Sequence, residues 1–326
     1  MSLFSKYFLI FFLGIGLSAC SQNQKQIMQN PQITADNIVE EISKQVKYYD
    51  YEPVYQIEFT INHCYAEILV NDILIYKSYE EEGESTTESI NYSILSKGDQ
   101  RITIKMYATE QNKKFINNSG VDVEIGSYDN KIKYSDKGKD IFQYSTKKDK
   151  DGIFIATGKT FYEETVTFNL SDVPYHNIGW SESQDLRRMN SAELEKKVIG
   201  YYQEMQNAIK NKDLDKIARM SYNKLRDQFV SEYATREDIQ EAWDEIVEVV
   251  NMDKELFPLD DYEMVFYGDG KSVALEQATL ELPLRGYSAL GAKYKTEKGS
   301  TLGDMSQLVL YLPQGKSLKD GLQIIR

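Results

Sequence analysis

The chain has 326 residues, with 38 basic and 51 acidic side chains and a net charge of −13. This balance argues against nucleic-acid binding and against a basic patch that holds an anionic leaflet, because both need clustered Lys and Arg. Two cysteines are too few for a zinc site built from Cys ligands. An acidic surface suits a basic protein partner, although solubility is the simpler interpretation.

The N-terminal segment contains an apolar run from residue 7 to residue 17, preceded by one charge at Lys6. A run of about eleven residues is too short to span a membrane and is typical of a signal peptide. The next residues, Leu17-Ser18-Ala19-Cys20, resemble the lipobox of bacterial lipoproteins. The resemblance implies that residues 1–19 are removed and that Cys20 carries acyl chains such as palmitate. Ser21 in place of Asp implies sorting to the outer membrane. The alternative is an ordinary secretory leader.

Residues 20–45 are expected to form a tether. Positions 21–37 are rich in Gln and Asn and show no hydrophobic period, which is typical of a flexible spacer. Several acyl chains on one residue hold a protein stably at a membrane. The expected partner of this end of the chain is therefore the membrane itself.

Residues 46–180 are predicted to form an antiparallel β-sandwich. Short β-branched and aromatic segments alternate with turn residues and leave no room for a helix. The pattern resembles immunoglobulin-like or jelly-roll modules, which carry no function at the residue level. The predicted strands are 54–61, 66–70, 73–79, 89–95, 101–108, 121–128 and 165–170.

Residues 187–326 are predicted to form an α+β layer. A helical apolar stripe begins after Asn190, with Asn190 or Ser191 as its N-cap. Asp213 can cap a short second helix through Met220, and a third helix follows Thr235. Strands follow Pro258, at 262–267, 272–282, 306–312 and 322–326. Residues 198–220 resemble the first helix pair of the NTF2-like superfamily, which implies helices on a curved antiparallel sheet (NTF2/cystatin-like) around a cone-shaped pocket. The His-Asp pair of its enzymes is missing, since no histidine follows position 176.

The sequence offers no catalytic constellation. His63 and His176 are the only histidines, no G-x-S-x-G turn exists, and P-loop, Rossmann and H-E-x-x-H motifs are absent. His63 and Cys64 are adjacent, and adjacent residues on a strand point to opposite faces, so we expect no hydrogen bond between their side chains. We therefore expect no enzyme, no cofactor and no metal site. An enzyme that uses carboxylates alone is the least favoured alternative.

Candidate partner-binding residues come from two segments. The first is Tyr-rich and contains Tyr48, Tyr49 and Tyr51; the chain has 24 tyrosines, and Tyr is enriched where proteins touch. Tyr is also ordinary strand material, which is the competing interpretation. The second is a long loop over residues 284–304, whose expected contact residues are Arg285, Tyr287, Lys293 and Tyr294.

These features predict a non-enzymatic, lipid-anchored binding protein at the outer membrane that faces the periplasm. It would dock or neutralise a partner protein, as the immunity lipoproteins that it resembles do. The alternative is a lipoprotein that binds a small molecule or glycan in a C-terminal NTF2-like pocket. A deep, half-apolar pocket beside the C-terminal sheet would favour this alternative.

Overall fold

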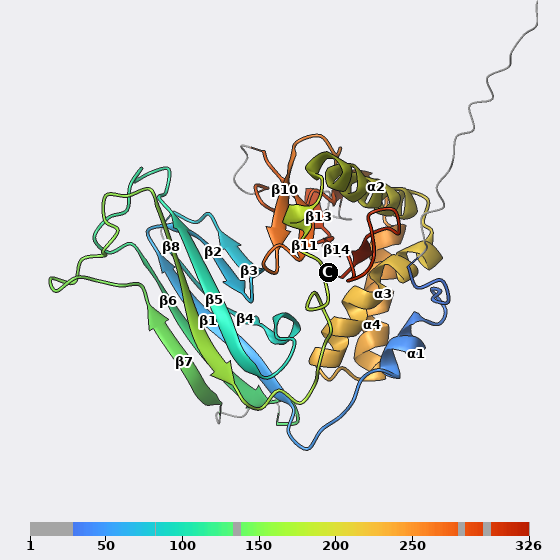
Figure 1. The fold of residues 1–326 in the computed structure, drawn as a ribbon, viewed down its shortest axis with the longest axis horizontal. Coiled ribbons are helices and arrows are strands. Elements are labelled where there is room, and N and C mark those ends of the chain that lie inside the picture. The colour runs from blue at the N-terminus through green and yellow to red at the C-terminus, as the bar shows by residue number, and fades with distance from the viewer. Residues whose placement is uncertain (1–28, 82, 133–137, 280–283, 296–300, 326) are drawn as a thin grey trace, which may run out of the picture.

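The computed structural model describes residues 29–325 except 82, 133–137, 280–283 and 296–300. The predicted signal peptide and Cys20 lie outside the described residues. In the N-terminal part, two four-stranded antiparallel sheets have the strand orders β4-β1-β6-β7 and β3-β2-β5-β8 (Figure 1). Their strands are β1 (Pro53–Asn62), β2 (Tyr65–Val70), β3 (Ile73–Ser78), β4 (Glu84–Ser89), β5 (Gly98–Tyr107), β6 (Gly120–Asp129), β7 (Lys139–Ser145) and β8 (Phe161–Leu170).

The two sheets share one hydrophobic core. On β1, every second residue is buried, so that Ile57 and Phe59 point inward and Glu58 between them is exposed. Ile102 and Ile104 of β5 reach the same core from the opposite sheet. Two facing sheets that fill one core with inward side chains have the arrangement of a sandwich. The prediction of a strand-rich, sandwich-like N-terminal region agrees with this core.

The predicted strand over residues 89–95 is wrong. In this segment Asn91–Ser93 form a short 3₁₀ turn instead. The buried Asn91 side chain accepts a hydrogen bond from Tyr55 N at 2.6 Å and donates to the carbonyls of Pro53 and Ser231. An amide with this many partners fixes the backbone around it, and a local apolar pattern does not reveal those distant partners.

The C-terminal part begins with helices whose caps were predictable. They are α2 (Ser191–Lys210), α3 (Leu214–Ser231) and α4 (Arg236–Asn251). Asn190 and Asp213 accept the predicted N-cap hydrogen bonds, and Thr235 forms a capping box with Asp238. The second helix is longer than predicted and continues past Met220, because Leu225 and Phe229 keep its apolar stripe buried.

The strands of the C-terminal part are short and antiparallel. In the described residues they form the sheets β10-β11-β14-β15 and β13-β12-β9. Their bounds are β9 (Lys254–Leu256), β10 (Tyr262–Tyr267), β11 (Ser272–Gln277), β12 (Gly291–Lys295), β13 (Thr301–Met305), β14 (Leu310–Tyr311) and β15 (Gln323–Ile324). The molecule is therefore α+β with antiparallel sheets, as predicted. Among the described helices, none combines the length and apolar character that a membrane span requires.

The described part of the predicted tether is core rather than spacer. Residues 38–43 form α1 (Ile38–Ser43), which packs against α3 and α4 (Figure 1). Ile33, Ile38, Val39 and Ile42 are buried in the hydrophobic cluster of the C-terminal part. The prediction failed because α1 is only six residues long, so its apolar positions do not establish a visible period.

We expect Ile38→Ala to lower the free energy of unfolding by about 3 kcal/mol, because it leaves a cavity in a fully buried site. Urea denaturation of the two chains measures the difference. The exposed Gln45 lies in the same segment, and Gln45→Ala should change stability by less than about 0.5 kcal/mol. Equal, small effects of both substitutions would show that this segment behaves as a tether.

Candidate functional site

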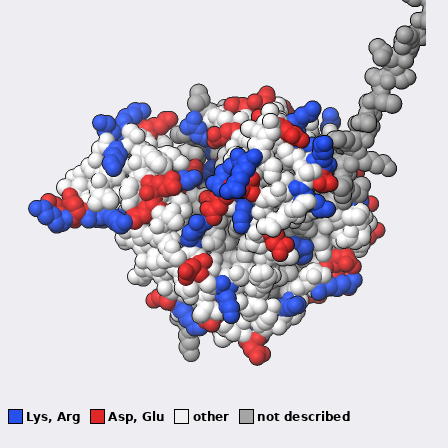
Figure 2. Space-filling model, viewed as in Figure 1, with Lys and Arg blue, Asp and Glu red and all other residues white. Residues whose placement is uncertain are grey.

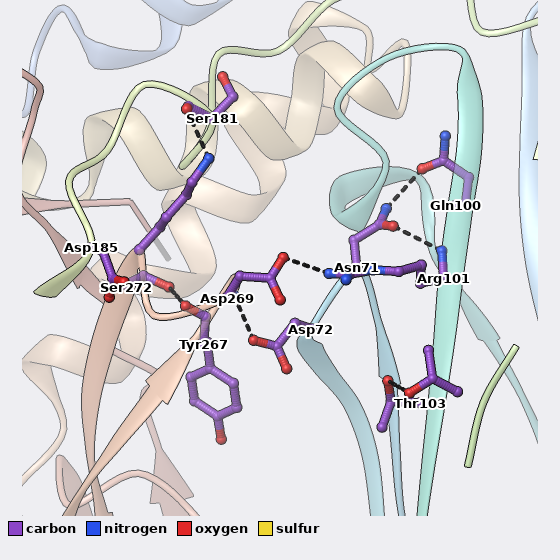
Figure 3. Close-up of polar contacts among 12 residues, drawn as sticks. Asn71, Asp72, Gln100, Arg101, Thr103, Ser181, Asp185, Tyr267, Asp269 and Ser272 are labelled. Atoms are coloured by element: carbon purple, nitrogen blue, oxygen red, sulfur yellow. Dashed lines mark hydrogen bonds and ion pairs between the residues drawn. The ribbon is translucent and has the colours of Figure 1, made fainter. Parts of the chain in front are cut away.

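The N-terminal and C-terminal parts meet where two tight turns touch (Figure 3). Asn71 and Asp72 form the turn between β2 and β3, both with positive φ, and Asp269 lies in the turn between β10 and β11. The Asp72 carboxylate accepts a hydrogen bond from Asp269 N at 2.6 Å. Arg101 of β5 holds the Asp269 carboxylate at 2.6 Å. The two turns are thus fixed tip to tip by a carboxylate from each turn and by Arg101 from β5.

A glycine makes this approach possible. Gly268 has a φ of +60° and donates its N–H to the Asp72 carbonyl at 3.0 Å. A Cβ at this position would lie 2.5 Å from Cδ1 of the buried Trp180. Both the left-handed backbone and the lack of space require glycine here. Trp180 belongs to a small apolar cluster that also contains Leu69 and Ile73 from the N-terminal part.

Beside this contact lies a cavity of about 310 Å³ between β3 and β11, which we call the junction cavity. Its walls combine aliphatic, aromatic and polar side chains from both parts of the molecule. The lining residues are Leu74, Ile75, Tyr76, Lys77, Tyr92, Ala274, Leu275, Glu276, Gly286, Tyr287, Ser288, Met305 and Gln307.

The junction cavity contains a buried ion pair. The Nζ of Lys77 lies 2.8 Å from the Glu276 carboxylate, and the two side chains are only 7% and 5% exposed. Lys77 also donates to the Gly286 carbonyl at 2.9 Å and lies 3.7 Å from Glu67. The Tyr267 hydroxyl donates to the other oxygen of Glu276. A buried charge pair is retained at low cost only when such additional hydrogen bonds satisfy it.

Burial and pairing act on these groups in opposite directions. Burial raises the pKa of the Glu276 carboxyl, and Lys77 counteracts this shift only in part. For Lys77, burial lowers the pKa, but the attraction of Glu276 and Glu67 outweighs it and the pKa is raised overall. Lys77 therefore stays charged, and its positive charge stabilises the buried Glu276 carboxylate.

One wall of the junction cavity is the edge of a sheet. β3 is the outermost strand of its sheet and pairs only with β2 among the described strands. Four consecutive residues of β3, Leu74 to Lys77, line the cavity. An edge strand presents backbone N–H and C=O groups that can pair with a further strand.

A second cavity of about 290 Å³ lies between the helices and the small sheets, and we call it the helix–sheet pocket. Its walls are mostly aliphatic, with Lys224, Glu245 and Lys254 among the lining residues. The other lining residues are Met205, Ile209, Ile217, Ser221, Leu225, Ala242, Ile246, Val249, Val250, Leu290, Ser306, Gln307, Leu308 and Ile324.

The predicted loop residues divide between two places. Tyr287 lines the junction cavity and is 45% exposed, and half-buried Arg285 is two positions before it. Lys293 and Tyr294 instead lie on β12, where Lys293 covers the Phe257 ring at 5.4 Å. The predicted loop is thus interrupted by strands β12 and β13, which sequence reasoning missed.

The Tyr-rich segment lies apart from the residues that line the junction cavity. The Tyr48 hydroxyl donates to the Ala234 carbonyl at 3.2 Å, and the ring is 61% exposed. Tyr49 packs edge-on against Tyr233, and Lys139 lies over the Tyr51 ring. Two of these tyrosines therefore contact the helical part of the same chain.

Sequence reasoning missed Lys77 and Glu276. Both residues fall inside predicted strands, Lys77 in 73–79 and Glu276 in 272–282, and neither strand pattern marks them as a pair. The available signal was Glu276 itself, a lone charge that ends a run of buried residues, Ser272 to Leu275. A carboxylate in such a run predicts a buried partner, but it does not identify Lys77, which lies 199 positions away.

The cysteine and the two histidines considered for catalysis do not form a common site among the described residues. Cys64 is fully buried, and burial raises the pKa of its thiol to about 12. His63 lies in the turn between β1 and β2, and His176 is exposed in the segment before Trp180. Among the described residues, no three His, Cys, Asp or Glu side chains are grouped to hold a metal ion.

Acidic and basic side chains are intermixed over the face in Figure 2.

We expect Lys77→Met to lower the free energy of unfolding by about 3 to 5 kcal/mol at pH 7, because it leaves the Glu276 carboxylate buried without its counter-charge. Without Lys77 the pKa of Glu276 rises further. A group with a raised folded-state pKa is tolerated while protonated, and its stabilisation is lost as the pH rises through that pKa. The loss should therefore be smaller at pH 5 than at pH 7, which denaturation at the two pH values measures.

The double variant Lys77→Met with Glu276→Gln is the matched control. It removes both charges, so it should recover most of the stability that the single variant loses. The interpretation is wrong if the double variant is as unstable as the sum of the single ones and the loss does not vary with pH.

We also expect Cys64 to resist alkylation by iodoacetamide at pH 8 in the folded chain, because a buried thiol with a raised pKa supplies almost no thiolate. Peptide mass spectrometry should find it modified only after unfolding in guanidinium. Rapid modification of the folded chain would contradict this placement of the thiol.

Comparison with protein-family models, curated proteins and solved structures finds no match for this chain.

Proposed function

We propose that this chain is a non-enzymatic, lipid-anchored protein that binds a partner protein in the junction cavity while facing the periplasm. The cavity and its strand edge support the binding role. The lipobox at Leu17 to Cys20 supports the anchor, and Ser21 supports the outer membrane as its location.

The observation that carries the proposal is the edge of β3 in an aromatic-walled cavity. An extended segment of a partner can pair with an edge strand through its backbone, while pockets beside the strand select its side chains. Tyr92 and Tyr287 line the cavity next to this edge. Such rings supply contact area with little loss of entropy and are enriched where proteins bind.

The charges limit what the partner can be. The chain has a net charge of −13, which favours a basic partner during the encounter. Inside the cavity, Lys77 and Glu276 already neutralise each other at 2.8 Å. An apolar or neutral polar side chain is thus the better occupant of the cavity itself, because a further charge there would be buried without a counter-ion.

The proposed partner is a toxin that acts in the periplasm, which the protein neutralises as immunity lipoproteins do. The tethered location, the acidic surface and the lack of a catalytic motif in the sequence support this assignment. If it holds, deletion of the gene should make cells sensitive to the captured partner.

The helix–sheet pocket favours a second candidate function, the binding of a small, mostly apolar molecule. It is bounded by α2, α3 and α4 on one side and by the short strands on the other. An NTF2-like arrangement of the C-terminal part, as one of two domains, belongs to the same proposal. The pocket between helices and strands supports it.

We expect a photoreactive residue in place of Tyr287 to crosslink the partner in living cells, because this side chain is 45% exposed at the junction cavity. The same residue in place of Tyr48 should yield no crosslink to that protein. Tyr48 is also exposed but does not line the cavity. Mass spectrometry of the crosslinked species identifies the partner.

Substitution of the strand edge provides the control. Ile75→Pro removes a backbone N–H from β3 and should abolish the crosslink at position 287, whereas Ile75→Val should preserve it. The melting temperature of each variant shows whether the fold survives. Crosslinks of equal yield from positions 287 and 48 would overturn the assignment of the binding site.

A further inference from the structure

We propose that the helix–sheet pocket binds the acyl chain of an anionic amphiphile drawn from the membrane to which the chain is anchored. This inference rests on the second candidate function and assigns its ligand class. It does not rest on the proposal that a partner protein binds in the junction cavity.

The wall of the pocket matches a hydrocarbon chain. Ile209 comes from α2, Leu225 from α3, Ala242 and Ile246 from α4, and Ile324 from β15. Most of the lining side chains are aliphatic. A glycan would need convergent hydrogen-bonding groups on these walls, whereas an acyl chain needs only apolar surface.

The charged lining residues favour an anionic head group. Lys224 and Lys254 contribute two positive charges against the single negative charge of Glu245. Lys224 is oriented by a hydrogen bond from its Nζ to the Gln307 carbonyl at 3.0 Å. The positive charge of the two ammonium groups attracts a carboxylate or phosphate head group to this end of the pocket.

The start of the described chain is fixed next to this pocket. The Gln29 side-chain amide donates to the Ile324 carbonyl at 2.9 Å and accepts from Ile324 N at 2.8 Å. Ile324 itself lines the pocket. Asn30 adds a bond to the Arg219 carbonyl of α3 at 3.1 Å.

This attachment limits how far the pocket can be from the membrane. Nine positions separate Gln29 from the proposed acylated Cys20, and nine residues span at most about 30 Å. The anchor therefore keeps the pocket near the bilayer, at a high local concentration of acyl chains.

The proposal is tested with palmitate that carries a diazirine group, added to the full lipidated chain in phosphatidylcholine nanodiscs. After illumination, peptide mass spectrometry should find the label on α3 and α4. Ala242→Trp fills the pocket and should reduce this labelling at least about tenfold. Glu241→Trp places the same side chain on the exposed face of α4 and should leave labelling unchanged.

A second blocking variant and a neutral probe complete the test. If Ala242→Trp fails to reach the melting temperature of the wild type, Ser221→Phe blocks the pocket from α3 instead. Lys224→Gln should weaken labelling by palmitate more than labelling by a diazirine-bearing hexadecanol. Only palmitate carries a negative charge that the Lys224 ammonium group can attract. Equal labelling of the wild type and both blocked variants would overturn the proposal, as would a label found only outside α3 and α4.

The design separates this proposal from the others. Crosslinking at position 287 reports on the junction cavity, and membrane fractionation of Cys20→Ser reports on the anchor. Wild-type labelling on α3 and α4 that disappears in Ala242→Trp supports the acyl site whatever the crosslink at position 287 shows.

Discussion

The burial of Lys77 against Glu276 is the interaction on which the functional part of this structure depends. The pair joins β3 of the N-terminal sandwich to β11 of the C-terminal sheet at 2.8 Å. Because neither charge is stable at this depth alone, the two parts can approach only in the register that brings the pair together. That register leaves the junction cavity open beside the pair.

The turn contact in Figure 3 supports the same register from a second point. The Asp72 carboxylate accepts a hydrogen bond from the Asp269 backbone N–H, and Arg101 of β5 forms an ion pair with the Asp269 carboxylate. Burial raises the pKa of Asp72, while the Asp269 N–H and Arg101 oppose that rise. Polar contacts of this kind require correct geometry, whereas the apolar cluster around Trp180 tolerates small shifts. The polar groups therefore fix the relative position of the N-terminal and C-terminal parts, and the apolar cluster supplies most of the stabilisation between them.

The sequence predicted what is local and missed what depends on distant partners. Caps at Asn190, Asp213 and Thr235 were predictable because each involves residues three positions apart. Asn91 was misread as strand because its partners, Pro53 and Ser231, lie 38 and 140 positions away. The Lys77–Glu276 pair was not predicted for the same reason, because its two residues lie 199 positions apart. Of the candidate site residues, Tyr287 was identified from the length of its loop alone. The junction cavity that it lines was not predicted.

The two cavities are separated by a shared wall, which links the binding events proposed for them. Gln307 lines both, and Tyr202 holds the segments on either side of the wall through hydrogen bonds to Leu275 and Leu308. If a ligand in one cavity moves Gln307, the affinity of the other cavity changes by the same factor in both directions. Tyr202 is fully buried and resists such movement of the backbone. A coupling between the cavities would therefore pass through side chains at the wall, of which Gln307 lines both cavities.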